Sequence, residues 1–109
     1  MTPEERRGEP RRACQRPCLV RFDRRHLDGV AGSVGAEGAV VDLSACGVGL
    51  LLRSAVPPGA TVTVNPLVHG GAPLPSARVV RCVPAGAGWR HGCGLERRLK
   101  EEELSAWLS

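Results

Sequence analysis

Short stretches in which apolar and polar residues alternate run along most of the chain. In the first of them, residues 17–22, one face carries Cys18, Val20 and Phe22, a spacing typical of a β-strand. Residues 29–38 contain four glycines among small residues and are interpreted as a loop or an irregular hairpin. Turn signals such as Pro-Pro-Gly separate the later stretches, and strands are predicted at 39–43, 48–52, 61–64, 77–83 and 89–95.

The hydrophobic period changes at the end of the chain. Within residues 96–108, Leu104, Trp107 and Leu108 share one face of a helix. Six short strands followed by one amphipathic helix predict a mainly all-β fold, a small six-stranded antiparallel β-barrel with a C-terminal α-helix. We expect the helix to cover one open end of the barrel, with Trp107 as its largest apolar surface.

The length of 109 residues suits one domain. Residues 1–12 are predicted to form a flexible Arg-rich arm, because they lack apolar periodicity, and residues 13–109 a single barrel domain. Eight Arg and four acidic residues in positions 1–26 account for the whole net charge of +4. Fourteen of the fifteen basic residues are Arg, whose planar fork suits phosphate and the guanine edge.

Several classes of function find no support in the sequence. No apolar run approaches the roughly 20 residues of a membrane span, and no hydrophobic signal segment follows the N-terminus, so we expect a cytoplasmic protein with reduced thiols. The cysteine and histidine spacings match zinc patterns poorly. The three histidines fall in unrelated segments and no nucleophile has a partner base, which predicts a protein that is not an enzyme and needs no metal or cofactor.

Two motifs remain, and their combination is informative. The first is the R-R-x-x-x-R of Arg6-Arg7-Gly8-Glu9-Pro10-Arg11, and the second is the D-x-S-x-x-G of Asp42-Leu43-Ser44-Ala45-Cys46-Gly47. Taken singly, an Asp-x-Ser before a tight turn is typical of a turn that satisfies its own backbone. In this order, with the strands and terminal helix around them, the motifs resemble the PilZ domain, the bacterial receptor module for cyclic di-GMP.

The resemblance implies a binding site for cyclic di-GMP, whose two phosphodiester charges and two guanines call for guanidinium groups. It implies that Asp42 and Ser44 offer side-chain oxygens to guanine N–H donors. We further expect Gly47 to adopt a positive φ and to allow close backbone approach. The implied ligand-binding residues are Arg6, Arg7, Arg11, Asp42, Ser44 and Gly47.

A second register of the arginine motif is open. Residues 11–16 also spell R-R-x-x-x-R, so Arg12 and Arg16 are possible secondary contacts. We prefer the register of Arg6, Arg7 and Arg11, because the preceding Glu5 and Pro10 follow the pattern of the family.

The expected function is that of a cyclic di-GMP receptor. The Arg arm would close over the ligand and change a surface for an unidentified downstream protein, or promote a ligand-dependent dimer. By resemblance, the affected processes would be motility, exopolysaccharide production or biofilm formation. One alternative is a PilZ-fold adapter that acts through protein contacts without ligand. A less favoured one is a nucleic-acid-binding small barrel, since the three aromatic residues do not form a stacking platform; no nucleic-acid partner and no membrane insertion are expected.

Overall fold

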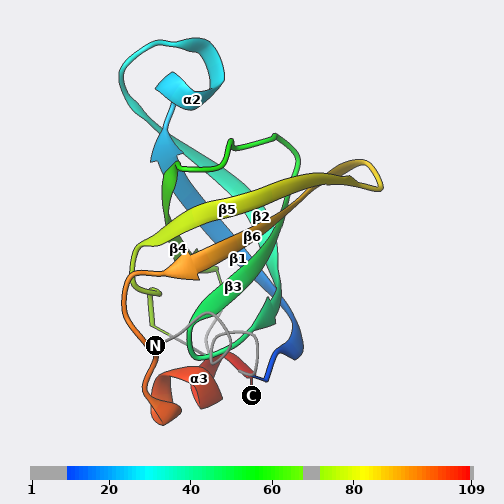
Figure 1. The fold of residues 1–109 in the computed structure, drawn as a ribbon, viewed down its shortest axis with the longest axis vertical. Helices are drawn as coiled ribbons and strands as arrows, with labels where there is room; N and C mark the ends of the chain where they lie inside the picture. Colours follow the sequence, from blue (N-terminus) through cyan, green and yellow to red (C-terminus); the bar gives the residue numbers. More distant parts are fainter. Residues whose placement is uncertain (1–9, 68–71, 109) are drawn as a thin grey trace.

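The barrel closes through six antiparallel strands in the spatial order β1-β2-β3-β6-β5-β4 (Figure 1). The computed structural model describes residues 10–67 and 72–108, without the side chains of His26 and Leu27. The predicted fold, a six-stranded barrel with a C-terminal helix, is confirmed. The strands are β1 (Arg12–Asp23), β2 (Ser33–Leu43), β3 (Gly47–Leu52), β4 (Thr61–Pro66), β5 (Ala77–Ala85) and β6 (Gly88–Leu95).

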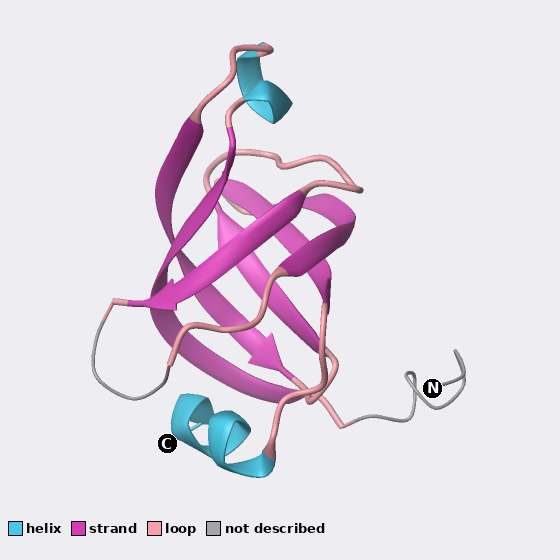
Figure 2. Cartoon of the chain, turned by 90° about the vertical axis from the view of Figure 1, so that its left-hand side faces the viewer, coloured by secondary structure: helices cyan, strands magenta, loops and turns pink. Residues whose placement is uncertain are grey.

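Helix α3 (Glu101–Leu108) lies at one end of the barrel in both views (Figures 1 and 2). Trp107 is 1% exposed and joins the core cluster, while its indole N–H donates to the carbonyl of Ala72 at 2.9 Å. The helix begins five residues later than the expected 96–108, because the backbone N–H of Lys100 donates to the Glu103 carboxylate at 2.9 Å. Such a bond caps the start of a helix. No helix in the described ranges has the length and apolar character to cross a membrane.

The hairpin of β1 and β2 is longer than expected. Of the loop or irregular hairpin expected at 29–38, residues 33–38 are part of a hairpin, but a regular one: they belong to β2 and pair with β1 from Ser33↔Asp23 to Gly38↔Cys18 without a shift. Small residues and glycine are tolerated there because the partner strand satisfies the backbone. A four-residue helix, α2 (Arg25–Asp28), forms the tip, and Gly29 ends it in the left-handed conformation with φ of 77°.

A β-bulge in β2 places Asp42 on the outside of the barrel. Val40 and Leu43 are both fully buried although three residues apart, so the in-out alternation is broken between them. The pairing shows the cause: Val40 pairs with Leu50 and Asp42 with Gly49, which leaves Val41 as an extra residue. Without this bulge, strict alternation from Val40 would turn the Asp42 side chain into the core.

Strand β5 contains a second bulge. Val79 pairs with Cys93 and Arg81 with Gly92, so Val80 is the extra residue. Val79 is 2% exposed and Val80 is 68% exposed. The bulge therefore leaves both Val80 and Arg81 exposed on the outside of the barrel.

Candidate functional site

The Asp42 carboxylate is bound by two guanidinium groups, one at each oxygen. Nη1 of Arg11 donates to Oδ1 at 2.8 Å, and Nη2 of Arg90 donates to Oδ2. The Asp42 side chain is 14% exposed, whereas both Arg side chains are 51% exposed. Arg11 precedes β1 and Arg90 lies in β6, so three parts of the chain meet at one carboxylate. Each oxygen makes a charge-assisted bond, and the trio has a net positive charge.

Two glycines of β3 make room for this arrangement. A Cβ on Gly49 would lie 2.5 Å from Oδ1 of Asp42, so only a glycine lets the carboxylate lie over β3. A Cβ on Gly47 would lie 3.0 Å from the carbonyl oxygen of Cys93 and 3.1 Å from Nη2 of Arg11. The expected close approach at Gly47 is therefore present.

The expected positive φ at Gly47 is wrong. Among the described glycines, positive φ occurs at Gly29, Gly32, Gly59 and Gly86. Gly47 is the first residue of β3 and pairs with Gly94 of β6. The feature that favours glycine at this position is the limited space, and not the backbone conformation.

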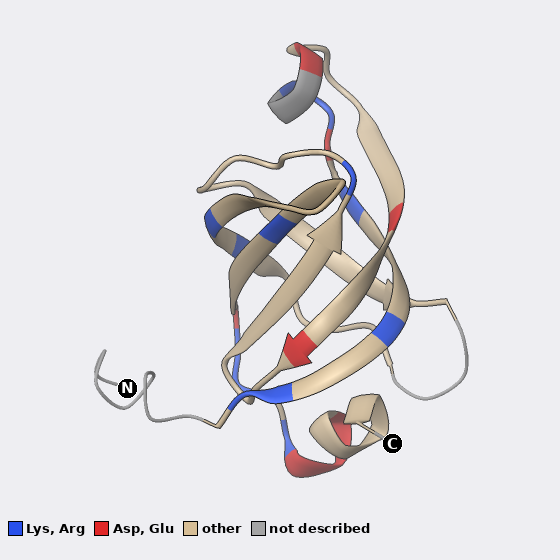
Figure 3. Ribbon diagram, turned by 90° about the vertical axis from the view of Figure 1, so that its right-hand side faces the viewer, with Lys and Arg blue, Asp and Glu red and all other residues tan. Residues whose placement is uncertain are grey.

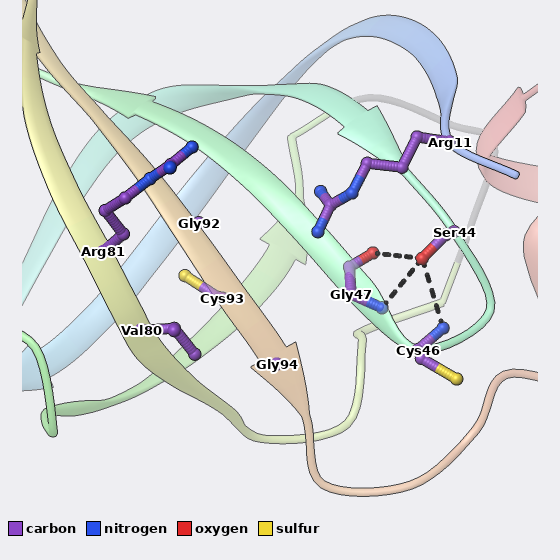
Figure 4. A pocket seen from close by; sticks show the side chains of 9 residues that line it. All are labelled: Arg11, Ser44, Cys46, Gly47, Val80, Arg81, Gly92, Cys93 and Gly94. Carbon is purple, nitrogen blue, oxygen red and sulfur yellow. Dashed lines mark hydrogen bonds between the residues drawn. The ribbon is translucent and has the colours of Figure 1, made fainter. Parts of the chain in front are cut away.

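Ser44 belongs to the turn that connects β2 and β3 (Figure 4). Its hydroxyl accepts the backbone N–H of Gly47 at 3.1 Å and that of Cys46 at 3.3 Å, and it donates to the carbonyl of Gly47 at 3.5 Å. Ser44 is 3% exposed. In this structure the hydroxyl fixes the turn that carries Gly47 beneath Arg11, and its contact with a ligand stays a prediction.

Two hollows lie beside the Asp42 carboxylate. The first, of about 290 Å³, is bounded by the turn of Ser44 and by β6 and β5. The second, of about 210 Å³, includes Asp42 and Arg90. Arg11, Arg81 and Gly92 line both hollows. Figure 4 shows Arg11 and Arg81 reaching the site from opposite sides of β3 and β6.

Strand pairing orders these residues into one line across the barrel wall. Arg81 of β5 pairs with Gly92 of β6, Gly92 with Gly49 of β3, and Gly49 with Asp42 of β2. We call these four residues the Asp42 row. Both bulges adjoin it, and a further register shift in β1 begins at Ala13, the partner of Asp42. The row thus has an acid at one end, a cation at the other and two glycines between them.

The predicted site residues fall into three groups. Arg6 and Arg7 lie outside the described residues. The structure brings Arg11, Asp42, Ser44 and Gly47 together, as described above. The possible secondary contacts, Arg12 and Arg16, line neither hollow.

Sequence reasoning missed Arg81, Arg90, Gly49 and Gly92. The charge count drew attention to residues 1–26, where the net charge lies, although two of the three Arg of the site come from β5 and β6. Figure 3 shows basic segments on several strands, whereas the first turn of α3 is acidic. One signal was present in the sequence. Glycines occur two positions apart at 47 and 49, and again at 92 and 94. In a strand, this spacing puts both glycines on the same face, which then has no side chains at these positions.

Three buried titratable groups in the interior of the barrel are neutral at pH 7. Burial raises the pKa of Cys93 to about 12 and that of Cys18 to about 11. Burial also lowers the pKa of His91, whose Nε2 accepts the backbone N–H of Val56 at 2.9 Å. Within the described part of the chain, no group of three or more His, Cys, Asp or Glu is placed to hold a metal ion. The charge of the site therefore comes from its Arg and Asp side chains.

Comparison with known proteins gives one result that covers nearly the whole chain. A family model described as the PilZ domain matches residues 5–108. This range includes both arginine registers, the Asp42 row and helix α3. No curated protein matches the chain.

Proposed function

Because the chain belongs to the PilZ domain family, a family of cyclic di-GMP-binding modules, we propose that it is a cyclic di-GMP receptor that binds its ligand on the outer face of β3 and β6. One observation carries the proposal. Arg11, the last residue of the arginine motif, contacts Asp42, the first residue of the second motif, across 31 positions of sequence. This contact supports a single site shared by the two motifs.

The charges of the site suit this ligand. Arg11, Arg81 and Arg90 line the second hollow together with a single carboxylate, that of Asp42, which leaves an excess of positive charge for the two phosphodiesters. A guanidinium group forms paired hydrogen bonds with phosphate oxygens or with O6 and N7 of guanine. Asp42 is the acceptor for guanine N–H groups, and we propose that a ligand phosphate replaces it as the partner of Arg11.

The dimensions of the hollows indicate how the ligand lies. Each hollow is smaller than the roughly 300–1,000 Å³ typical of small-molecule sites. We propose that one ligand spans both, because Arg11, Arg81 and Gly92 border the two hollows alike. Arg6 and Arg7 then close over it from the N-terminal arm, which changes the surface offered to a downstream protein or a second copy.

Isothermal titration calorimetry with cyclic di-GMP tests the proposal. We expect binding by the wild-type protein and a loss of at least about tenfold in affinity for Arg7→Ala and for Asp42→Ala, since each removes a charged ligand contact. Arg53→Ala is the matched control, because Arg53 is exposed and lines neither hollow. Absence of binding by the wild type, or unchanged affinity in both site variants, would contradict the proposal.

Cyclic di-AMP separates base recognition from charge attraction. It has the same two phosphodiesters, but adenine lacks the N1–H and N2 amino donors of guanine, which a carboxylate accepts, and carries an amino group in place of O6. We expect it to bind more weakly to the wild type, and the preference for the guanine ligand to shrink in Asp42→Ala. Equal affinity of the wild type for both dinucleotides would show that Asp42 does not read the base.

A further inference from the structure

The outer face of β3 and β6 carries four glycines in two cross-strand pairs. Gly47 pairs with Gly94, and Gly49 pairs with Gly92. A glycine inside a strand costs roughly 0.5–1 kcal/mol relative to alanine, and it offers no side chain to its neighbours. Each of these positions therefore calls for a physical reason.

Crowding supplies the reason in β3 but not in β6, where a Cβ on Gly94 would meet only Cγ2 of Val80 at 3.9 Å. As described above, a Cβ on Gly49 would overlap the Asp42 carboxylate, and a Cβ on Gly47 would lie in tight contact with the Cys93 carbonyl and the Arg11 side chain. A Cβ on Gly92 would meet nothing within 4 Å. Gly92 also lacks the positive φ that only glycine adopts readily. Neither packing nor backbone conformation explains why this residue has no side chain.

The position of Gly92 suggests another reason. It lines both hollows and lies in the Asp42 row between Arg81 and Gly49. Neighbouring strands are about 4.8 Å apart, so the backbones of Arg81 and Asp42 are separated by roughly 14 Å. Any side chain on Gly92 would project outward between them, into the space where the two hollows meet.

We propose that Gly92 is a ligand-binding residue whose bare backbone forms the floor of the site, against which the flat face of one guanine base lies. The Asp42 carboxylate at one end of the row and the Arg81 guanidinium at the other are placed to meet the hydrogen-bonding edges of that base. This inference deepens the proposed function and rests on it. It assigns the floor to a residue outside both sequence motifs.

A substitution series at Gly92 tests the inference without disturbing the fold. Gly92→Ala and Gly92→Val place increasing bulk in open space, and valine favours strands. We expect both variants to melt at or above the wild-type temperature. Calorimetry should show weaker cyclic di-GMP binding in Gly92→Ala and a loss of at least about tenfold in Gly92→Val.

Gly35→Val is the matched control. Gly35 lies in β2, has no positive φ, lines neither hollow, and a Cβ there would make only ordinary contacts from 3.5 Å outward. We expect this variant to bind like the wild type. In a nitrogen-15 spectrum of the wild type, the Gly92 amide signal should shift on addition of cyclic di-GMP while the Gly35 signal stays in place.

The possible outcomes separate this inference from the proposed function. If the wild type and Gly92→Val bind cyclic di-GMP equally well, the proposed role of Gly92 is wrong, whereas the proposed receptor function is retained. An unfolded Gly92→Val, or equal weakening by Gly35→Val, also overturns the role of Gly92, because the effect then comes from the strand and not from the site. If the wild type does not bind, the proposed function fails and the floor fails with it.

Discussion

The two walls of this barrel are built differently. Where β1 meets β4, the pairing runs from Cys18↔Pro66 to Phe22↔Val62 without a shift, and inward residues such as Val20 and Val64 are fully buried. The wall of β2, β3, β6 and β5 has bulges at Val41 and Val80 and four outward glycines. The first wall only encloses the core, so strict alternation serves it. The second also presents a site, and each departure from alternation lies beside the Asp42 row.

This difference separates stability from binding. Residues of the regular wall stabilise the fold through burial. In the irregular wall, glycines and bulges give up strand stability and place one acid and three cations on the outer face. Substitutions in the regular wall should therefore act mainly on the stability of the fold, and those in the irregular wall mainly on ligand binding. Both quantities can be measured.

The largest effect is expected from the regular wall. Phe22→Ala removes a ring that is 4% exposed and packed in the core cluster. Such truncations cost about 3–5 kcal/mol of unfolding free energy, a large share of the 5–15 kcal/mol typical of a domain. Urea unfolding measures the loss, and binding by the folded fraction should be retained. Val30→Ala, at an exposed position, is the control; a loss below about 1 kcal/mol for Phe22→Ala would contradict the assigned core.

Alternation in the sequence was enough to predict six strands, the barrel and the helix at its end, although the first half of β2, residues 33–38, was not predicted as a strand. The regular wall was easiest, because Cys18, Val20 and Phe22 follow a period of two. The site was harder to predict because it depends on breaks in that alternation. A bulge such as that at Val41 has no characteristic sequence pattern. Its existence depends on how β2 pairs with β3.

Arg90 illustrates a second limit on prediction. It lies 48 positions from Asp42, and only the pairing of β3 with β6 brings the two side chains together. Ser44 illustrates the converse. Its motif predicted a ligand contact, whereas the same residue types also suit a turn that bonds its own backbone, as observed here.

The next largest effect is expected at Gly49, where the irregular wall is most crowded. In Gly49→Ala the added Cβ would lie 2.5 Å from the Asp42 carboxylate, so the acid must move. We expect a cost of about 1–3 kcal/mol in stability and at least about tenfold in affinity for cyclic di-GMP. Gly92→Ala, in open space, is the control for stability. Equal melting temperatures for the two variants would show that the carboxylate adapts without strain.

A smaller effect is expected at Arg90. Arg90→Met keeps much of the side-chain length but removes the charge that holds Oδ2 of Asp42. The pair is half exposed on the Arg side, so stability should change by no more than about 1 kcal/mol. We expect affinity to fall about threefold to tenfold, because Asp42 loses one of its two anchors.

A double substitution tests whether Arg90 acts through the acid. In an Asp42→Ala background, Arg90→Met should have little further effect on affinity, since the anchored group is absent. Arg53→Met controls for the loss of one positive charge. Additive losses from Arg90→Met and Asp42→Ala would contradict the role of Arg90 in positioning Asp42 and would indicate a direct contact with the ligand.

The smallest effect concerns His91, which faces the core from the same strand that carries Gly92. Burial lowers its pKa below the ordinary 6.5, and its Nε2 must stay unprotonated to accept the Val56 N–H. Below pH 6.5 the unfolded chain therefore binds more protons, so stability should fall as the pH drops from about 6.5 through the folded pKa, by at most about 1.4 kcal/mol per pH unit. Glu103, whose pKa Arg97 lowers to about 2, affects the stability only below pH 4.5.

Urea unfolding at pH 7 and pH 5 should show this loss of stability in the wild type and a smaller loss in His91→Gln. An equal loss of stability in both proteins would show that a group other than His91 causes the acid sensitivity.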